Sequence, residues 1–220
     1  MLTIDIVSDV VCPWCYIGKR RLEAALADLR QARPDLPVAI RWLPYFLNPD
    51  TPPQGEPYRP FLEAKFGGPE KLAETWARLR EAGNSVGINF AFERIEVRAN
   101  TLAAHRLIHH MQRTLPQATK DLVEGLFMIS FVEPRNLGDH EVLARIADAA
   151  GWDYQSALDF LAGDGEEEQV LALAERVQQM GVTSVPFFIF GGRLGVSGAQ
   201  SPEILRQAMD QAIAGTAAND

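Results

Sequence analysis

The sequence predicts an α/β fold that is interrupted by an inserted all-helical domain. Three observations support this prediction. A strand, a helix and a second strand follow one another at the start of the 220-residue chain, the middle of the chain shows helical patterns almost throughout, and a β-hairpin and a helix close it. We therefore expect residues 1–47 and 181–220 to form one domain and residues 48–180 to form the helical insertion.

The first of these segments has the pattern of a βαβ unit. Side chains from Leu2 to Val7 alternate between apolar and polar, which is typical of a half-buried strand. Apolar side chains at helical spacing follow as far as Ala32, and Pro34 ends the pattern. Residues 37–43 indicate a second strand, and strands joined in this way are parallel.

The middle of the chain is expected to begin with a proline-rich exit from the first domain and to continue with helices. Six prolines between residues 44 and 60 disfavour both helix and strand there. Six helices are expected to follow, each with a capping residue, a proline or acidic residues at its start. Their predicted starts are Pro69, Asn100, Pro116, Asp139, Asp153 and Glu166. We expect Glu166–Glu168 to complement a helix N-terminus rather than to form a binding patch.

The end of the chain returns to strand patterns. Pro186–Phe190 indicates a strand, Gly191–Gly192 a two-residue turn, and Arg193–Val196 the partner strand of a hairpin. Ser201 is expected to cap a last helix, which Gly215 should end.

Composition limits the classes of partner. The net charge of −8 argues against nucleic acid and anionic membranes. Met1 leads directly into the first strand, without the pattern of a signal peptide, and no run of about 18 apolar residues is present. We therefore expect a cytoplasmic protein without a membrane partner. The sequence makes no prediction of the oligomeric state.

The only two cysteines, Cys12 and Cys15, lie where the first strand gives way to the first helix. At a helix N-terminus the unpaired N–H groups and the helix dipole favour an anion, and the thiolate is the reactive form of cysteine. A structural zinc site would need about four ligands, and a purely structural disulfide across so short a loop constrains the unfolded chain little. Two inert core cysteines would not be expected to bracket a helix start. The spacing and its context therefore predict a redox pair.

Other polar residues are weaker candidates. Asp9 lies three residues before Cys12 and could accept a proton or tune that cysteine; the alternative is a solvated carboxylate at a strand end. His105 and His109 are four residues apart on a predicted helix, with His110 adjacent, but no third ligand completes a metal site. We therefore predict that no metal is bound.

The whole chain resembles the DsbA-like oxidoreductases, and most closely their FrnE-like branch. The order of the predicted elements is that of a thioredoxin fold with a helical insertion. The stretches that carry the resemblance are Ser8–Gly18, Leu47–Asp50, Asn100–Ile108 and Gly181–Pro186. In thioredoxin-like proteins a cis-proline opens the last-but-one strand against the active-site disulfide, and Pro186 occupies this place. The alternative is that Pro186 merely starts a strand.

The resemblance implies thiol–disulfide exchange on protein or small-molecule disulfides and dithiols. Cys12 would attack as a thiolate, and Cys15 would resolve the mixed disulfide. The backbone of Val185 would pair with an extended substrate segment, and Trp14 would be exposed at the lip of the site, unless it is a core aromatic residue. The residues expected to contact substrate are Pro13, Trp14, Val185, Pro186, Asn100 and His105. No tightly bound cofactor is implied, and glutathione is a candidate co-substrate.

Two other functions remain open. The 2-hydroxychromene-2-carboxylate isomerases and kappa-class glutathione transferases share this fold, but usually have a serine in place of Cys12 and lack the second cysteine. Because this chain retains Cys12 and Cys15, we favour the redox function. A non-enzymatic binding or chaperone module is the second alternative, and its activity would survive replacement of both cysteines.

Overall fold

The computed structural model describes residues 1–217 and contains two compact units. One unit combines Met1–Tyr45 with Leu173–Asp220, and the other is Phe46–Ala172. The second boundary differs from the predicted one at residue 181, because it falls inside helix α8 (Glu167–Gln179). The residues of α8 after Ala172 therefore count with the first unit.

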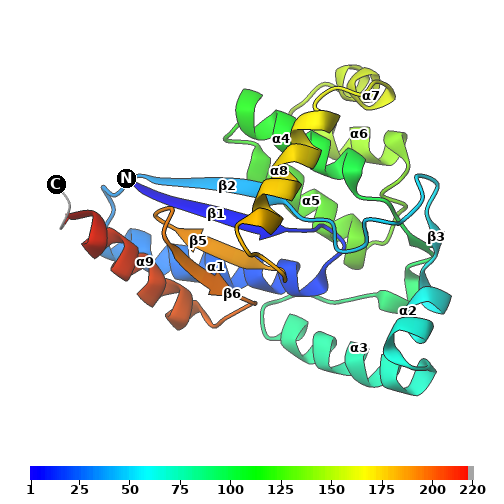
Figure 1. Ribbon diagram of the computed structural model, residues 1–220, viewed down its shortest axis with the longest axis horizontal. Helices are drawn as coiled ribbons and strands as arrows, with labels where there is room; N and C mark the ends of the chain where they lie inside the picture. Colours follow the sequence, from blue (N-terminus) through cyan, green and yellow to red (C-terminus); the bar gives the residue numbers. More distant parts are fainter. Residues whose placement is uncertain (218–220) are drawn as a thin grey trace. The chain divides into compact units, whose positions relative to one another are not determined.

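The first unit contains a four-stranded mixed sheet in the order β2-β1-β5-β6 (Figure 1). Its strands are β1 (Leu2–Ser8), β2 (Val38–Pro44), β5 (Phe187–Phe190) and β6 (Leu194–Ser197). Strand β1 is parallel to β2, as the strand–helix–strand pattern predicts, and antiparallel to β5. This arrangement is the sheet of a thioredoxin fold. The helices α1 (Pro13–Ala32) and α9 (Pro202–Ala217) pack against each other beside the sheet.

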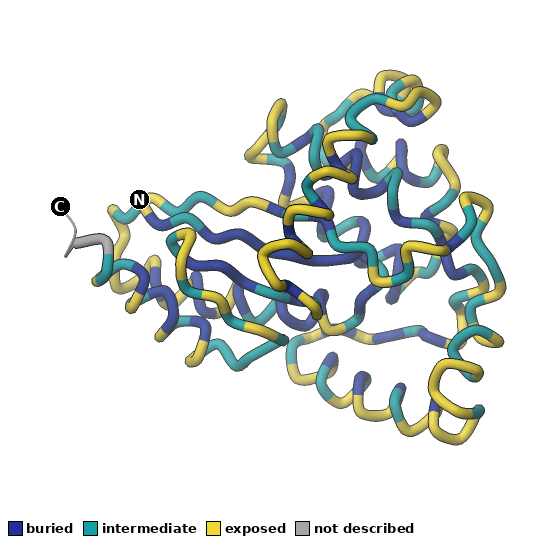
Figure 2. Tube along the Cα trace, viewed as in Figure 1, coloured by how far each residue is buried: buried dark blue, intermediate teal, exposed yellow. Residues whose placement is uncertain are grey.

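Strand β1 is buried almost along its whole length, so the prediction of a half-buried strand was wrong (Figure 2). Val7 belongs to a buried cluster that includes Val177 of α8, and this helix covers part of the second sheet face. Asp5, which the alternating pattern would leave in solvent, is 7% exposed and forms a two-point ion pair with Arg41 of β2, at 2.5 and 2.8 Å. The ion pair compensates the burial of the carboxylate.

Two predicted details at the end of the chain were wrong by a few residues. Phe190 pairs with Leu194, so three residues, and not two, connect the strands of the hairpin. Helix α9 continues through Gly215 to Ala217. Its predicted cap is confirmed, since the Ser201 hydroxyl accepts a hydrogen bond from the N–H of Ile204, at 3.4 Å.

The second unit consists mainly of helices. They are α2 (Tyr58–Phe66), α3 (Pro69–Asn84), α4 (Leu102–Thr114), α5 (Thr119–Phe131), α6 (His140–Ala149), α7 (Tyr154–Ala162), the start of α8 and a short 3₁₀ turn, Phe92–Arg94. Helix α2 was not predicted because it contains Pro60, but a proline in the first turn removes no intrahelical hydrogen bond. A two-stranded sheet of β3 (Glu56–Pro57) and β4 (Val97–Arg98) makes the insertion not wholly helical.

Most predicted helix starts in this unit are confirmed. Asp139 and Asp153 accept hydrogen bonds from backbone N–H groups in the first turns of α6 and α7. The Asn100 side chain accepts from the N–H of Leu102, but the N-cap of α4 is Thr101, one residue later than predicted. Pro116 is an exception, because α5 begins only at Thr119. The turn that contains Pro116 precedes the helix.

Glu166 does not lie in the first turn of α8 as predicted. It precedes the helix in the left-handed region, with φ of 63°, which is unusual for a residue other than glycine. Its carboxylate contacts Nδ1 of His109 at 2.5 Å and Nδ1 of His110 at 2.9 Å, both on α4. Arg113 also binds this carboxylate, at 3.0 Å. Glu166 is therefore a clamp between the start of α8 and helix α4.

Candidate active site

Cys12 and Cys15 occupy the junction that the sequence predicts. Strand β1 ends at Ser8, a turn follows in which the N–H of Cys12 donates to the carbonyl of Asp9 at 3.1 Å, and Cys12 is the N-cap of α1. Pro13 is the first helical residue, and the N–H of Cys15 donates to the carbonyl of Cys12 at 3.0 Å. Both cysteines are free thiols on the first turn of one helix. This geometry places both sulfur-bearing residues at the positive end of the helix dipole.

The Cys15 thiol has a strongly raised pKa. Cys15 is 2% exposed, and burial raises the pKa of its thiol well above the usual value. Hydrogen bonding and charge at Cys12 raise this pKa further, while contacts with Ser8 and the Asp9 backbone oppose the rise in part. Cys15 is therefore held as a neutral thiol at neutral pH, which favours Cys12 as the first nucleophile.

The loop before β5 lies against Cys12. The thiol of Cys12 donates to the carbonyl of Val185 across 3.8 Å, a weak sulfur hydrogen bond between residues 173 positions apart in the chain. The peptide bond between Val185 and Pro186 is cis. The carbonyl of Pro186 is bonded to the N–H of Gly198 at 2.8 Å, which anchors the loop next to β6.

Gly18 allows this loop to approach helix α1 closely. A Cβ atom at position 18 would lie 2.9 Å from Cγ of Pro186 and 3.2 Å from Cζ of Phe188. No role for Gly18 follows from the cysteine motif itself. The available signal was a glycine in a helix interior, which lowers helix stability and often marks a close contact.

The remaining predicted residues near the cysteines have different exposures. Trp14 is 42% exposed, as expected for a residue at the lip of a site, whereas Pro186 is buried and Val185 is half-buried. Asp9 is 1% exposed, so the alternative of a solvated carboxylate at the strand end was wrong. The carbonyl of Asp9 accepts from the N–H of Cys12, so the chain turns into α1 at this residue.

Asn100 and His105 belong to the second unit and have local roles there. The Asn100 amide donates to the carbonyl of Thr51 at 2.8 Å, and its side-chain oxygen accepts from the N–H of Leu102 at 2.9 Å. His105 is 5% exposed, and its ring packs edge-on against Phe46 with centroids 5.1 Å apart. Contact of these two residues with substrate stays a prediction.

The histidines of α4 have partners within the protein. His109 and His110 both use Nδ1 to bind Glu166. Within residues 1–217 no three His, Cys, Asp or Glu side chains are arranged to hold a metal ion. In the same part of the chain, no helix combines the length and the apolar character that a membrane span requires.

The chain is similar to known proteins in both sequence and structure. A family model of the DSBA-like thioredoxin domain matches residues 3–210. The uncharacterized protein YwbO of Bacillus subtilis is 24% identical over 209 residues, with 94% of each chain covered. The crystal structure of a probable DsbA oxidoreductase from Streptomyces coelicolor has a TM-score of 0.87 and 29% identity, and the match covers 97% of this chain and 91% of that one.

A third relative was solved with a thiol compound. The cytosolic disulfide reductase DsbM from Pseudomonas aeruginosa with GSH has a TM-score of 0.63 and 16% identity. The match covers 99% of this chain and 98% of that chain. At this identity the similarity shows the fold alone.

Proposed function

Because the chain belongs to the family of DsbA-like thioredoxin domains, we propose that it is a thiol–disulfide oxidoreductase and that Cys12 and Cys15 are its reacting groups. One observation carries the proposal. Two free thiols lie at the first turn of α1, burial raises the pKa of the Cys15 thiol, and the Cys12 thiol contacts the Val185 carbonyl. This arrangement supports redox chemistry over glutathione-dependent isomerisation, which needs no second thiol.

The reaction begins at Cys12. Its thiolate forms a bond to one sulfur of the substrate disulfide, the substrate S–S bond breaks, and the departing sulfur takes up a proton. Cys15 then loses its proton to solvent and attacks Sγ of Cys12, which expels the second substrate sulfur. The substrate has gained two electrons and two protons, and the protein holds a disulfide between Cys12 and Cys15. In reverse, the same steps oxidise a dithiol.

The electrostatic coupling between the two cysteines favours attack by Cys12 first and by Cys15 second. The charge and hydrogen bonding of Cys12 contribute to the raised pKa of Cys15 in the reduced protein. In the mixed disulfide Cys12 carries neither a charge nor a proton, so these two contributions disappear. Cys15 then ionises more readily than before, at the step where its thiolate is needed.

The Val185 carbonyl has a second role in the proposal. While Cys12 is in its thiol form, this carbonyl accepts the S–H hydrogen bond. When Cys12 forms the mixed disulfide, this donor is lost and the carbonyl becomes available to an N–H of an extended substrate, as in strand addition. Pro13 and Trp14, which follow Cys12 directly, are proposed to contact the substrate as well.

Glutathione is the proposed co-substrate. Two molecules of glutathione would reduce the Cys12–Cys15 disulfide and leave as glutathione disulfide, which completes the cycle. The similarity to a disulfide reductase solved with GSH supports this choice.

Reduction of insulin disulfides by glutathione tests the proposal. We expect catalysis by the native protein, and loss of catalysis in Cys12→Ser and in Cys15→Ser, with circular dichroism to confirm that both variants fold. The exposed Arg145→Gln variant is a control on the second unit and is expected to retain full activity. Catalysis that persists in the Cys12→Ser/Cys15→Ser double variant would exclude the dithiol mechanism.

A further inference from the structure

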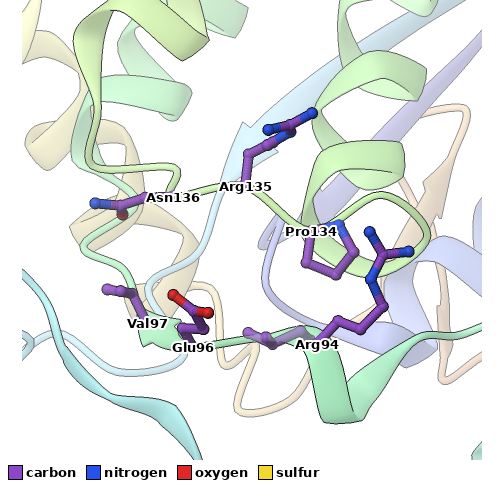
Figure 3. A pocket seen from close by; sticks show the side chains of 7 residues that line it. Arg94, Glu96, Val97, Pro134, Arg135 and Asn136 are labelled. Atoms are coloured by element: carbon purple, nitrogen blue, oxygen red, sulfur yellow. The ribbon is translucent and has the colours of Figure 1, made fainter.

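The second unit contains a pocket of about 450 Å³ that the proposed thiol chemistry does not use. Residues 94–97 line one side of it and residues 134–136 the other (Figure 3). Its volume is in the range of small-molecule sites and too small for a folded partner.

The charged side chains of the pocket are not engaged within the protein. Arg94, Glu96 and Arg135 are exposed, and within residues 1–217 none of these side chains has a hydrogen-bond or ion-pair partner. This differs from Arg80 nearby in the same unit, which pairs with Glu93. Three unpaired charges that line one hollow are available to a ligand.

The walls of the pocket are fixed by backbone hydrogen bonds. The carbonyl of Glu96 accepts from the N–H of Tyr58 at 2.9 Å, and the N–H of Arg135 donates to the carbonyl of Ile129 at 2.8 Å. The Asn136 side chain accepts from the N–H of Gly138 at 2.9 Å, which leaves its amide N–H groups as donors. The site is therefore largely formed before a ligand arrives, which lowers the cost of binding.

The two signs of charge are separated across the pocket. Figure 3 shows the Arg94 guanidinium beside Pro134, whereas the Glu96 carboxylate lies next to Val97. Apolar side chains line the space together with these charges. A ligand with an anion at one end and a cation at the other fits this pattern better than a simple anion, which Glu96 would repel.

We propose that this pocket binds a small zwitterion of the amino-acid or short-peptide class. The ligand carboxylate pairs with Arg94, whose guanidinium group matches a carboxylate geometrically. The ligand ammonium pairs with Glu96. The apolar residues contact the carbon atoms between the two charged ends.

Binding of glycyl-leucine to the whole protein at low salt, followed by NMR, tests the proposal. We expect saturable shifts of residues 94–97 and 134–136. Acetylation of the dipeptide amine, or amidation of its carboxylate, should each weaken binding about two- to fivefold, the effect of one exposed ion pair. Glu96→Gln should abolish the penalty of acetylation only, and Arg94→Gln the penalty of amidation only.

One control variant and two contrary results complete this test of the pocket. Arg145→Gln, an exposed arginine of the same unit, should change none of these affinities. The absence of saturable shifts at these two segments would overturn the proposal. Binding of inorganic phosphate that is as tight as that of the dipeptide, and that improves in Glu96→Gln, would also overturn it, because it would identify a simple anion site.

Discussion

Replacement of Gly18 by alanine tests how closely the Pro186 loop must pack on helix α1. The added Cβ atom would lie 2.9 Å from Cγ of Pro186 and 3.2 Å from Cζ of Phe188, whereas carbon atoms in contact are about 3.5–4.0 Å apart. Both neighbours are buried, so neither ring can simply rotate into solvent. The helix and the loop must therefore move apart.

The expected change in stability is the difference between two effects. Overpacking costs about 1–3 kcal/mol, and alanine in place of glycine in a helix interior contributes about 0.5–1 kcal/mol. We expect a net destabilisation near 1 kcal/mol, which lowers the melting temperature by about 2–4 °C for a chain of this length. The displaced loop also disturbs the 3.8 Å contact between Cys12 and Val185. Exchange with a peptide disulfide should therefore slow.

Gly215→Ala is the matched control for this measurement. A Cβ atom at position 215, on α9, approaches Nη2 of Arg193 at 3.0 Å, and this flexible side chain can move away. We expect unchanged exchange and equal or slightly higher stability by urea unfolding. If Gly18→Ala matches Gly215→Ala in both stability and exchange rate, the close packing of the loop on α1 does not constrain the site.

Three further predictions concern single side chains. Because the pKa of Cys15 is raised in the folded protein, the unfolded chain loses the thiol proton at a lower pH than the folded protein does. The free energy of unfolding should therefore fall above about pH 9, by at most about 1.4 kcal/mol per pH unit. Urea unfolding in the presence of reductant measures this pH dependence, which should be absent in Cys15→Ala. Burial tends to raise the pKa of Glu166, but interactions with His110 and His109 outweigh burial and lower the pKa. Glu166→Gln should therefore destabilise the protein by about 1–3 kcal/mol at pH 7. The difference from the native protein should become smaller as the pH falls below about 4.5. Trp14→Ala, at an exposed position, should raise KM for a peptide disulfide while leaving the exchange rate with a small aromatic disulfide nearly unchanged.

Local patterns predicted the elements that carry the chemistry. The strand–helix junction, the position of Cys12 at the helix start and the caps Asp139 and Asp153 all follow from residues close together in the chain. The parallel pairing of β1 and β2 follows from the connection between them. These features depend on short-range geometry, which a sequence displays directly.

The features that sequence did not predict depend on distant segments. The burial of Asp5 needs Arg41 on the next strand, and the covering of Val7 needs a helix 170 residues later in the chain. The clamp at Glu166 needs the histidines of α4. In the sequence, three successive glutamates favour a helix N-terminus whether or not one of them binds a histidine elsewhere in the chain. Only the folded structure shows that Glu166 binds the histidines of α4.

The most direct test of the account is the site at which a mixed disulfide forms. Each single serine variant is incubated with a peptide disulfide, quenched with acid and mapped by mass spectrometry. We predict that Cys15→Ser accumulates one peptide on Cys12, because attack proceeds and resolution cannot. Cys12→Ser should remain unmodified, since burial, the largest cause of the raised pKa of the Cys15 thiol, does not depend on Cys12. Accumulation of the peptide on Cys15 in Cys12→Ser, with none on Cys12 in Cys15→Ser, would contradict the assigned roles.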